Sequence, residues 1–284
     1  MRRDLHEQNR LSWNAATAAH NSHKADQAGF FRRGGDTLFP EEVELLGDLR
    51  GMRVLHLQCN AGQDTLSLVQ RGAVATGVDI SDEAIDFAQR LSADSGVPAT
   101  FERADVYDWL AAAGAIPEPR FDIVFSSYGA LCWLSDPRSW ARGVASVLRP
   151  GGRLVVVEFH PVLMMFESNL TLRYSYFAGP PIDWADGVRD YVAVSDVGLT
   201  DSGWVDGVQN FRNPHRCHEF QWTIADILTA VIDAGLRVDA FREYPYSNGC
   251  RFLDEQIRDE EQRWRLPPEM PQVPQMFALA ARCA

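Results

Sequence analysis

Two acidic residues follow successive apolar runs, and this placement suits the recognition of a nucleoside. Asp79 closes "TGVDI" and Asp105 closes "FERADV". Ligands of open parallel sheets bind beyond the carboxyl ends of the strands. A carboxylate after one strand can accept hydrogen bonds from ribose hydroxyls, and a carboxylate after the next can accept one from an adenine amino group. Ile80 and Val106, directly after these acids, could pack on the adenine faces. The competing interpretation is that the acids merely cap the helices that follow.

The stretch "VLHLQCNAGQDTLSL", residues 54–68, predicts a strand, a tight turn and a helix start. Such a turn often presents backbone N–H groups to phosphate. The dinucleotide template G-x-G-x-x-G, laid down from Gln58, has Gln58, Asn60 and Gln63 at its glycine positions. No lysine follows Gly62, as a phosphate-binding P-loop would require. A turn for a carboxylate- or amine-bearing ligand fits better, and a side chain at Gly62 would crowd that ligand.

The elements that position these residues alternate between strand and helix, which predicts an α/β fold with a mostly parallel sheet. Ser81 and Gly96 are expected to cap the second of the helices, and Ser12 the first helix of the chain. A charged, exposed helix is expected over residues 254–264. The expected strands cover residues 52–59, 73–80, 98–106, 121–129, 153–160, 237–245 and 274–282, and the helices between them cover 62–72, 81–96, 107–114, 136–152 and 223–236.

Composition excludes several classes of function. The formal net charge is −12 and the estimated pI about 5.0, so the chain repels phosphate backbones and nucleic acid is not an expected partner. No apolar run reaches membrane-spanning length, and the polar N-terminus has no signal-peptide core. We therefore expect a cytoplasmic protein with no membrane partner. The five cysteines show no C-x-x-C spacing, and "HRCHE" at 215–219 lacks a third ligand, so no metal is expected.

On these residues the chain resembles the class I S-adenosylmethionine-dependent methyltransferases. The resemblance covers residues 40–160 and 219–282. It rests on "VLHLQCNAG", "GVDIS", "RADV", "FDIVFSSYG" and "LRPGGRLVVVEFH". The first motif of that family usually reads V-L-D-L-G-C-G-x-G, whereas here His56 replaces the acid and Gln58 and Asn60 replace glycines. The resemblance implies a Rossmann-like, seven-stranded sheet whose last strand, residues 274–282, inserts antiparallel beside residues 237–245.

The resemblance also implies that successive segments of the chain have different roles. Residues 1–50 would form an N-terminal helical lid, 51–162 the S-adenosylmethionine-binding core, 163–218 an aromatic insertion over the acceptor, and 219–284 the end of the core sheet. The aromatics of the insertion are equally consistent with a small core or with an interface between two copies of the chain. The residues implied to bind the donor, whose product is S-adenosylhomocysteine, are Trp13, Lys24, Gln58, Asn60, Gly62, Asp79, Ile80, Asp105, Val106 and Ser126.

The acceptor is the least constrained part of the interpretation. A large apolar pocket under an aromatic lid favours a small, flat aromatic or terpenoid molecule over a protein tail or a polar metabolite. The closest resemblance is to actinobacterial enzymes of specialised metabolism that methylate the indole ring of tryptophan-derived compounds. Such an acceptor must lose a proton, and His20, His160 or Tyr128 could take it. A lone histidine is more often simply packed or solvated. O- or N-methylation of another metabolite, a nicotinamide oxidoreductase and a non-catalytic binding module are the alternatives.

Overall fold

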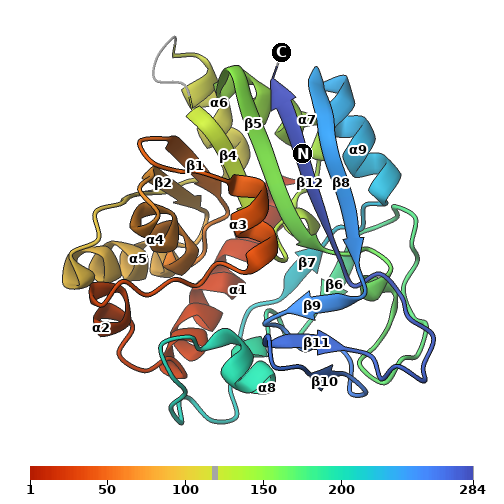
Figure 1. Ribbon diagram of the computed structural model, residues 1–284. Helices are drawn as coiled ribbons and strands as arrows, with labels where there is room; N and C mark the ends of the chain where they lie inside the picture. The colour runs from red at the N-terminus through yellow and green to blue at the C-terminus, as the bar shows by residue number, and fades with distance from the viewer. Residues whose placement is uncertain (117–120, 284) are drawn as a thin grey trace.

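The computed structural model describes residues 1–116 and 121–283, and its centre is a seven-stranded sheet in the order β3-β2-β1-β4-β5-β12-β8 (Figure 1). The first five strands of this order are parallel, and β12 pairs antiparallel with both of its neighbours. The expected Rossmann-like fold with a reversed last strand is therefore confirmed. The strands are β1 (Arg53–Leu57), β2 (Val74–Asp79), β3 (Thr100–Arg103), β4 (Phe121–Ser127), β5 (Leu148–Phe159), β8 (Leu236–Tyr244) and β12 (Met276–Cys283).

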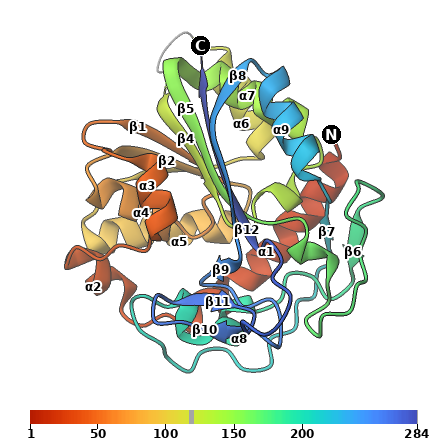
Figure 2. The ribbon, with the colours of Figure 1, turned by 45° about the vertical axis from the view of Figure 1, so that its right-hand side comes forward.

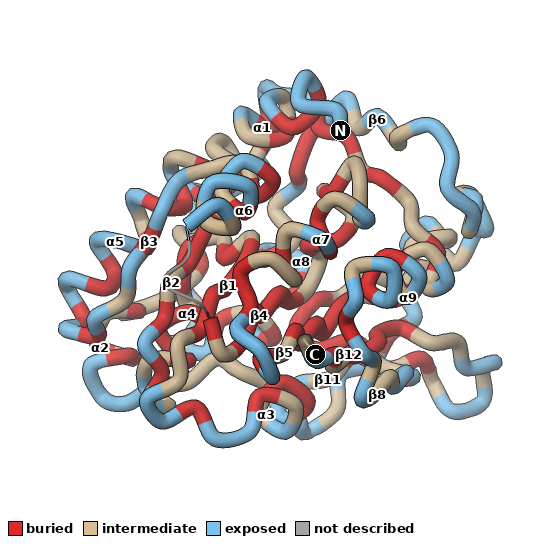
Figure 3. The backbone as a smooth tube through the Cα atoms, turned by 90° about the horizontal axis from the view of Figure 1, so that it is seen from above, coloured by how far each residue is buried: buried red, intermediate tan, exposed pale blue. Residues whose placement is uncertain are grey.

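Helices cover both faces of this sheet, because neighbouring residues of each central strand point to opposite sides. On one face Leu55 and Val124 pack beneath α6 (Val106–Gly114), α7 (Pro137–Val147) and α9 (Ile224–Asp233). On the other face Val54, Ile123 and Val155 pack beneath α3 (Pro40–Leu46) and α4 (Gln63–Gln70). The central strands are consequently buried, while the outer surfaces of the helices are exposed (Figure 3).

The helix boundaries follow local capping chemistry in most places. Ser81 caps α5 (Asp82–Ser95) by accepting a hydrogen bond from the Ala84 N–H, and Gly96 ends it with φ 72°, both as predicted. The prediction that Ser12 caps the first helix is wrong. Helix α1 runs over Arg3–Ser22, and Ser12 is buried inside it, where its hydroxyl accepts the Val188 N–H at 2.9 Å.

Two smaller sheets lie below the carboxyl ends of the main strands (Figure 2). One is the antiparallel pair β6 (Ile182–Trp184) and β7 (Cys217–Glu219). The other consists of β9 (Tyr246–Asn248), β11 (Arg263–Arg265) and β10 (Ile257–Arg258). The helix expected over residues 254–264 is therefore wrong.

Tertiary contacts explain why that charged segment is extended. Trp264 is buried and its indole N–H donates to the Gly249 carbonyl at 2.9 Å. Arg263 forms an ion pair with the buried Glu41 at 2.7 Å, and Arg265 forms one with Asp259 at 2.6 Å. An extended strand sends alternate side chains to a buried and a solvated side, and a helix would break this pattern.

The remaining helices lie along the N-terminal segment and the insertion: α2 (Gln27–Arg32) follows α1, and α8 (Tyr191–Ser195) packs against α1. In the part of the chain that the structure describes, no helix combines the length and apolar character needed to cross a membrane. The same residues contain no group of three or more His, Cys, Asp and Glu side chains arranged to hold a metal ion.

Candidate active site

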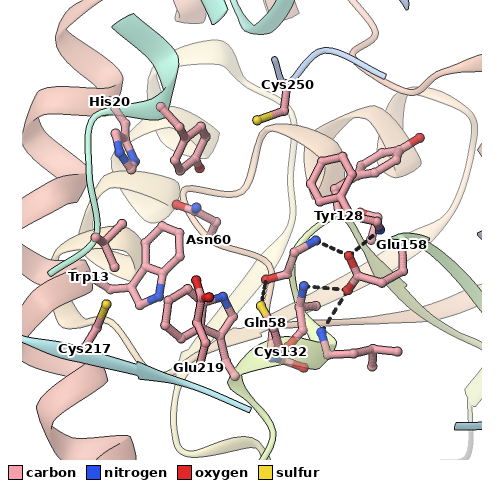
Figure 4. A pocket seen from close by; sticks show the side chains of 18 of the residues that line it. Trp13, His20, Gln58, Asn60, Tyr128, Cys132, Glu158, Cys217, Glu219 and Cys250 are labelled. Atoms are coloured by element: carbon pink, nitrogen blue, oxygen red, sulfur yellow. Dashed lines mark hydrogen bonds between the residues drawn. The ribbon is translucent and has the colours of Figure 1, made fainter. Parts of the chain in front are cut away.

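A cavity of about 820 Å³ lies at the carboxyl ends of the central strands. Its walls come from α1, from the loops after β1 to β5, and from the 163–218 segment (Figure 4). A volume of this order suits one or two small organic molecules. The predicted site residues that line the cavity are Trp13, His20, Lys24, Gln58, Asn60, Asp79, Ile80, Asp105, Val106 and Tyr128.

The turn after β1 has the backbone of a glycine-rich loop despite its sequence. Gln58, Asn60 and Gly62 have φ values of 55°, 48° and 80°. These are the places where the resembling family has glycine, so the substitutions preserve the path of the chain. Asn adopts this left-handed conformation readily, whereas at Gln58 it costs roughly 1–2 kcal/mol. Such strain is retained where the surroundings fix the conformation.

The Asp79 carboxylate lies at the tip of β2 and is half-buried. It accepts the Asn60 N–H and the Ser81 N–H, each at 2.8 Å. Burial raises the pKa of Asp79, although these backbone donors oppose the shift. Each carboxylate oxygen can accept more than one hydrogen bond, so capacity remains for a ligand in the cavity.

The Asp105 carboxylate already has protein partners. His6 of α1 donates to it from Nδ1 at 2.7 Å, and the Tyr107 N–H donates at 2.9 Å, so Asp105 also caps α6. The desolvation of Asp105 is outweighed by these hydrogen bonds, and its pKa is lowered. A ligand amino group would therefore share this carboxylate with His6, a residue that the sequence did not single out.

Three residues of the N-terminal segment face the cavity from the side opposite the sheet. The Trp13 indole packs edge-on against Trp133 and His20. His20 Nε2 lies 2.9 Å from the Arg189 carbonyl, which can only accept, so Nε2 carries the proton and Nδ1 has no partner among the described residues. Burial lowers the pKa of His20 to about 4. Burial also lowers the pKa of Lys24, while the charges of Asp64 and Asp201 act against the shift.

Gly62 and Ser126 lie outside the cavity. A Cβ atom on Gly62 would stand 2.7 Å from both the Ala88 Cβ and the Phe101 ring, so glycine is required here for packing between α4, α5 and β3. The prediction that a side chain at Gly62 would crowd a ligand is therefore wrong, because it would crowd Ala88 and Phe101 instead. Ser126 is fully buried, and its hydroxyl has no partner among the described residues. Ser127 lines the cavity instead.

Two of the three predicted proton acceptors are poorly placed. His160 is 2% exposed and does not line the cavity, because its Nε2–H donates to Glu243 at 2.9 Å and its Nδ1 accepts the Val162 N–H. The Tyr128 ring lines the cavity, but its hydroxyl accepts a hydrogen bond from Asn248 at 2.9 Å. Burial raises the pKa of Tyr128 well above its usual value. Of the three, His20 alone lines the cavity with an acceptor atom that has no partner among the described residues, and this Nδ1 atom is itself buried.

The loop after β4 is held by a residue that sequence reasoning missed. The buried Glu158 carboxylate at the end of β5 accepts the N–H groups of Gly129, Ala130 and Leu131, the last two at 2.7 and 2.8 Å, and its own neighbour Phe159 at 2.7 Å (Figure 4). Glu158 is visible in the string "VVVEFH", but three of its four partners, residues 129–131, lie far away in the sequence.

We predict that His56 makes the free energy of unfolding depend on pH. This residue stands where the first motif of the resembling family usually has an acid. It is buried, its Nδ1 lies 2.9 Å from the Thr65 hydroxyl, and burial lowers its pKa to about 3. Since the unfolded chain takes up a proton near pH 6.5 and the folded chain does not, the free energy of unfolding falls as the pH drops below about 6.5. The expected slope from His56 is about 1.4 kcal/mol per pH unit.

Urea unfolding between pH 6 and 4 measures this slope. The variant His56→Asn should show a flatter dependence than wild type, and the matched variant His215→Asn, at an exposed histidine, should keep the wild-type slope. Equal slopes in His56→Asn and wild type would contradict the assignment.

Comparison with known proteins agrees with this geometry. Residues 54–152 match the family model described as a methyltransferase domain. The ubiquinone biosynthesis O-methyltransferase of Bordetella avium (strain 197N) is 33% identical over 109 residues, which are 38% of this chain and 43% of that protein. The chain thus matches less than half the length of this curated relative.

Solved structures extend the comparison to most of the chain. An S-adenosylmethionine-dependent methyltransferase from Mesorhizobium loti superposes with a TM-score of 0.53 at 23% identity, over 86% of this chain and 96% of that one. A putative S-adenosylmethionine-dependent methyltransferase from Listeria monocytogenes superposes with a TM-score of 0.56 at 16% identity, with the same coverage of both chains. The chain therefore has the fold of the S-adenosylmethionine-dependent methyltransferases.

Proposed function

We propose that this protein transfers a methyl group from S-adenosylmethionine to a small aromatic acceptor. The observation that carries the proposal is the half-buried Asp79 carboxylate, which is fixed by two backbone N–H groups at the tip of β2 and faces a cavity large enough for donor and acceptor. The methyltransferase-domain match over residues 54–152 supports the same activity.

The residues at the cavity fit the donor. Gln58 donates its amide N–H to the Ala130 carbonyl at 2.6 Å, which leaves its buried Oε1 without a partner among the described residues. An ammonium group such as that of the donor's methionine moiety would satisfy this acceptor. Asp79 would hold the ribose, and Asp105 the adenine amino group together with His6. Ile80 and Val106 would flank the adenine ring, and Lys24 would pair with the donor's carboxylate.

When bound, the donor supplies a methyl group already activated by a sulfonium charge. The work of the chain is then to orient the acceptor and exclude water. Trp13 and His20 from α1, and Tyr191 from α8, cover the cavity on the side away from the sheet. We therefore assign to residues 1–50 and 163–218 the role of covering segments over the core.

The aromatic lining favours a flat acceptor, and our more specific proposal is methylation at carbon of the indole ring in a tryptophan-derived compound. The aromatic residues that line the cavity include Trp13, Trp133, Phe166, Tyr174, Trp184, Tyr191 and Phe252. The name of the Bordetella avium relative, an O-methyltransferase of ubiquinone biosynthesis, makes O-methylation of a phenol the principal alternative.

Two measurements test the proposal. Titration calorimetry with S-adenosylhomocysteine is expected to show binding, and a protein that binds none would refute the donor. Isotope-labelled S-adenosylmethionine, offered with indole diketopiperazines, phenols and prenyl diphosphates, then identifies the acceptor. Label found only in the phenols would rule out carbon methylation of indole.

A further inference from the structure

The antiparallel strand pair β6–β7 presents one of its faces to the cavity. Its register pairs Ile182 with Glu219 and Trp184 with Cys217, and all four residues line the cavity. The intervening pair, Asp183 and His218, points to the other face, where the two side chains lie 3.7 Å apart. Because side chains alternate along a strand, Glu219 must point toward the cavity, and it is the only acid on the inward face of this strand pair.

The Glu219 carboxylate points into the cavity beside the Trp13 indole (Figure 4). Glu219 is half-buried and lines the cavity, where the Trp184 indole N–H is a neighbouring donor among the described residues. That contact falls short of hydrogen-bond geometry, because the Trp184 Nε1 has no hydrogen-bond partner within the described part of the chain. Burial raises the pKa of Glu219, and the neighbouring Trp184 and the charge of Arg189 oppose the shift.

A carboxylate in such surroundings calls for a donor from outside the chain. An ionised carboxylate can only accept hydrogen bonds, and one that loses its contact with water when a ligand fills the cavity needs a donor from that ligand. The walls around Glu219 are aromatic, so the missing donor belongs to a molecule that stacks on or packs against aromatic rings. A ring N–H meets both requirements, since it provides the polar hydrogen within a flat apolar body.

We propose that Glu219 accepts a hydrogen bond from the ring N–H of the acceptor and takes that proton when a ring carbon is methylated. This inference rests on the proposed methyltransferase function. In the step, a bond forms between the ring carbon and the methyl carbon, and the bond from sulfur to that carbon breaks, leaving its electron pair on sulfur as the sulfonium charge is lost. The electron pair for the new bond comes from the ring, the nitrogen becomes an imine, and its proton passes to the Glu219 carboxylate.

Glu219 suits this role better than the histidine at the same cavity. The Nδ1 of His20 has no partner among the described residues but is itself buried, and burial holds the pKa of His20 near 4, so it retains a proton poorly. For the carboxylate of Glu219 burial has the opposite effect, because protonation removes the buried charge. A base whose pKa lies closer to the working pH is more effective.

The test compares probes that differ only in the ring N–H. Cyclo(L-Trp-L-Trp) and its derivative methylated at N1 of both indole rings are titrated into the complex of the protein with S-adenosylhomocysteine, and methyl transfer is measured in parallel with 2-naphthol as a ring O–H probe. Wild type is expected to bind the N–H probe at least about tenfold more tightly than the N-methylated one, the size of a hydrogen bond to a charged group. Glu219→Leu, which has no acceptor, should bind both about equally, and Glu219→Gln, which keeps an acceptor oxygen but cannot take up the proton, should lose at least tenfold in kcat with the N–H probe.

The control variant is Asp183→Asn, on the partner strand and facing the other way, which should retain wild-type discrimination and turnover. Equal binding of the two indole probes by wild type, methylation of 2-naphthol alone, unchanged discrimination in Glu219→Leu, or an unchanged kcat in Glu219→Gln would each overturn the inference. These outcomes are distinct from a failure of the proposed function, in which wild type would not bind S-adenosylhomocysteine at all.

Discussion

The variant Asp79→Ala is expected to bind S-adenosylhomocysteine on the order of 100-fold more weakly than wild type, or not measurably. Two hydrogen bonds from ribose hydroxyls to a charged carboxylate are worth about 1.5–3 kcal/mol each, and both are lost. The substitution also removes hydrogen bonds within the protein, since the Asn60 and Ser81 N–H groups lose their acceptor. Calorimetric titration at pH 7.5 gives the dissociation constants.

A second variant and a control separate binding from folding. Asp79→Asn keeps the shape and one acceptor oxygen, so it should fold like wild type yet still bind weakly. Glu83→Ala removes an exposed acid from the next helical turn and should bind as wild type does. Undiminished affinity in Asp79→Ala, with circular dichroism showing a folded protein, would defeat the assignment of Asp79 to the donor.

The variant Glu158→Ala should lower the free energy of unfolding by roughly 3–5 kcal/mol, as expected when one partner of a buried charged network is removed. The N–H groups of Gly129, Ala130, Leu131 and Phe159 would lose their common acceptor inside the protein. Since that loop carries Tyr128 and borders the cavity, methyl transfer should fall as well. Chemical denaturation gives the stability, and the labelled-donor assay gives the rate.

Glu243→Gln is the matched control for this loss. Glu243 is an acid on β8 whose side chain is 52% exposed and which pairs with a single residue, His160. The Gln side chain keeps an acceptor oxygen for the His160 Nε2–H at this half-exposed position, so this variant should remain close to wild type. If Glu158→Ala were as stable as Glu243→Gln, the proposed anchoring of the loop would be wrong.

The core of the fold could be predicted from the sequence because its signals are local. Apolar runs such as "VLHL" and "LVVV" belong to strands buried on both faces, and Ser81 and Gly96 mark the ends of α5 within a few residues. The segment 254–264 was mispredicted because its charges suggested a solvated helix. Its actual conformation depends on the pairing of β11 with β9 and on the distant partner Glu41.

The candidate site was predictable only where residues follow a strand. Asp79 and Asp105 were found because a parallel sheet brings the carboxyl ends of its strands together. His6, Glu158 and Glu219 were missed because no spacing relates them to those strands. Their roles arise from contacts with Asp105, with the loop after β4 and with the cavity. Similarly, the positive φ angles of Gln58 and Asn60 are invisible in residue types that rarely adopt them.

The place of β12 within the sheet has a consequence for how the chain is made. Among the strands of the main sheet this one comes last in chain order, yet it fills the gap between β5 and β8. Until the ribosome has released it, the hydrogen-bonding edge of β5 stays open while everything from His160 to Gln275 is translated. Exposed edges of this kind invite pairing with other nascent chains. We therefore expect a requirement for chaperones in the cell, and aggregation of chains truncated before Met276.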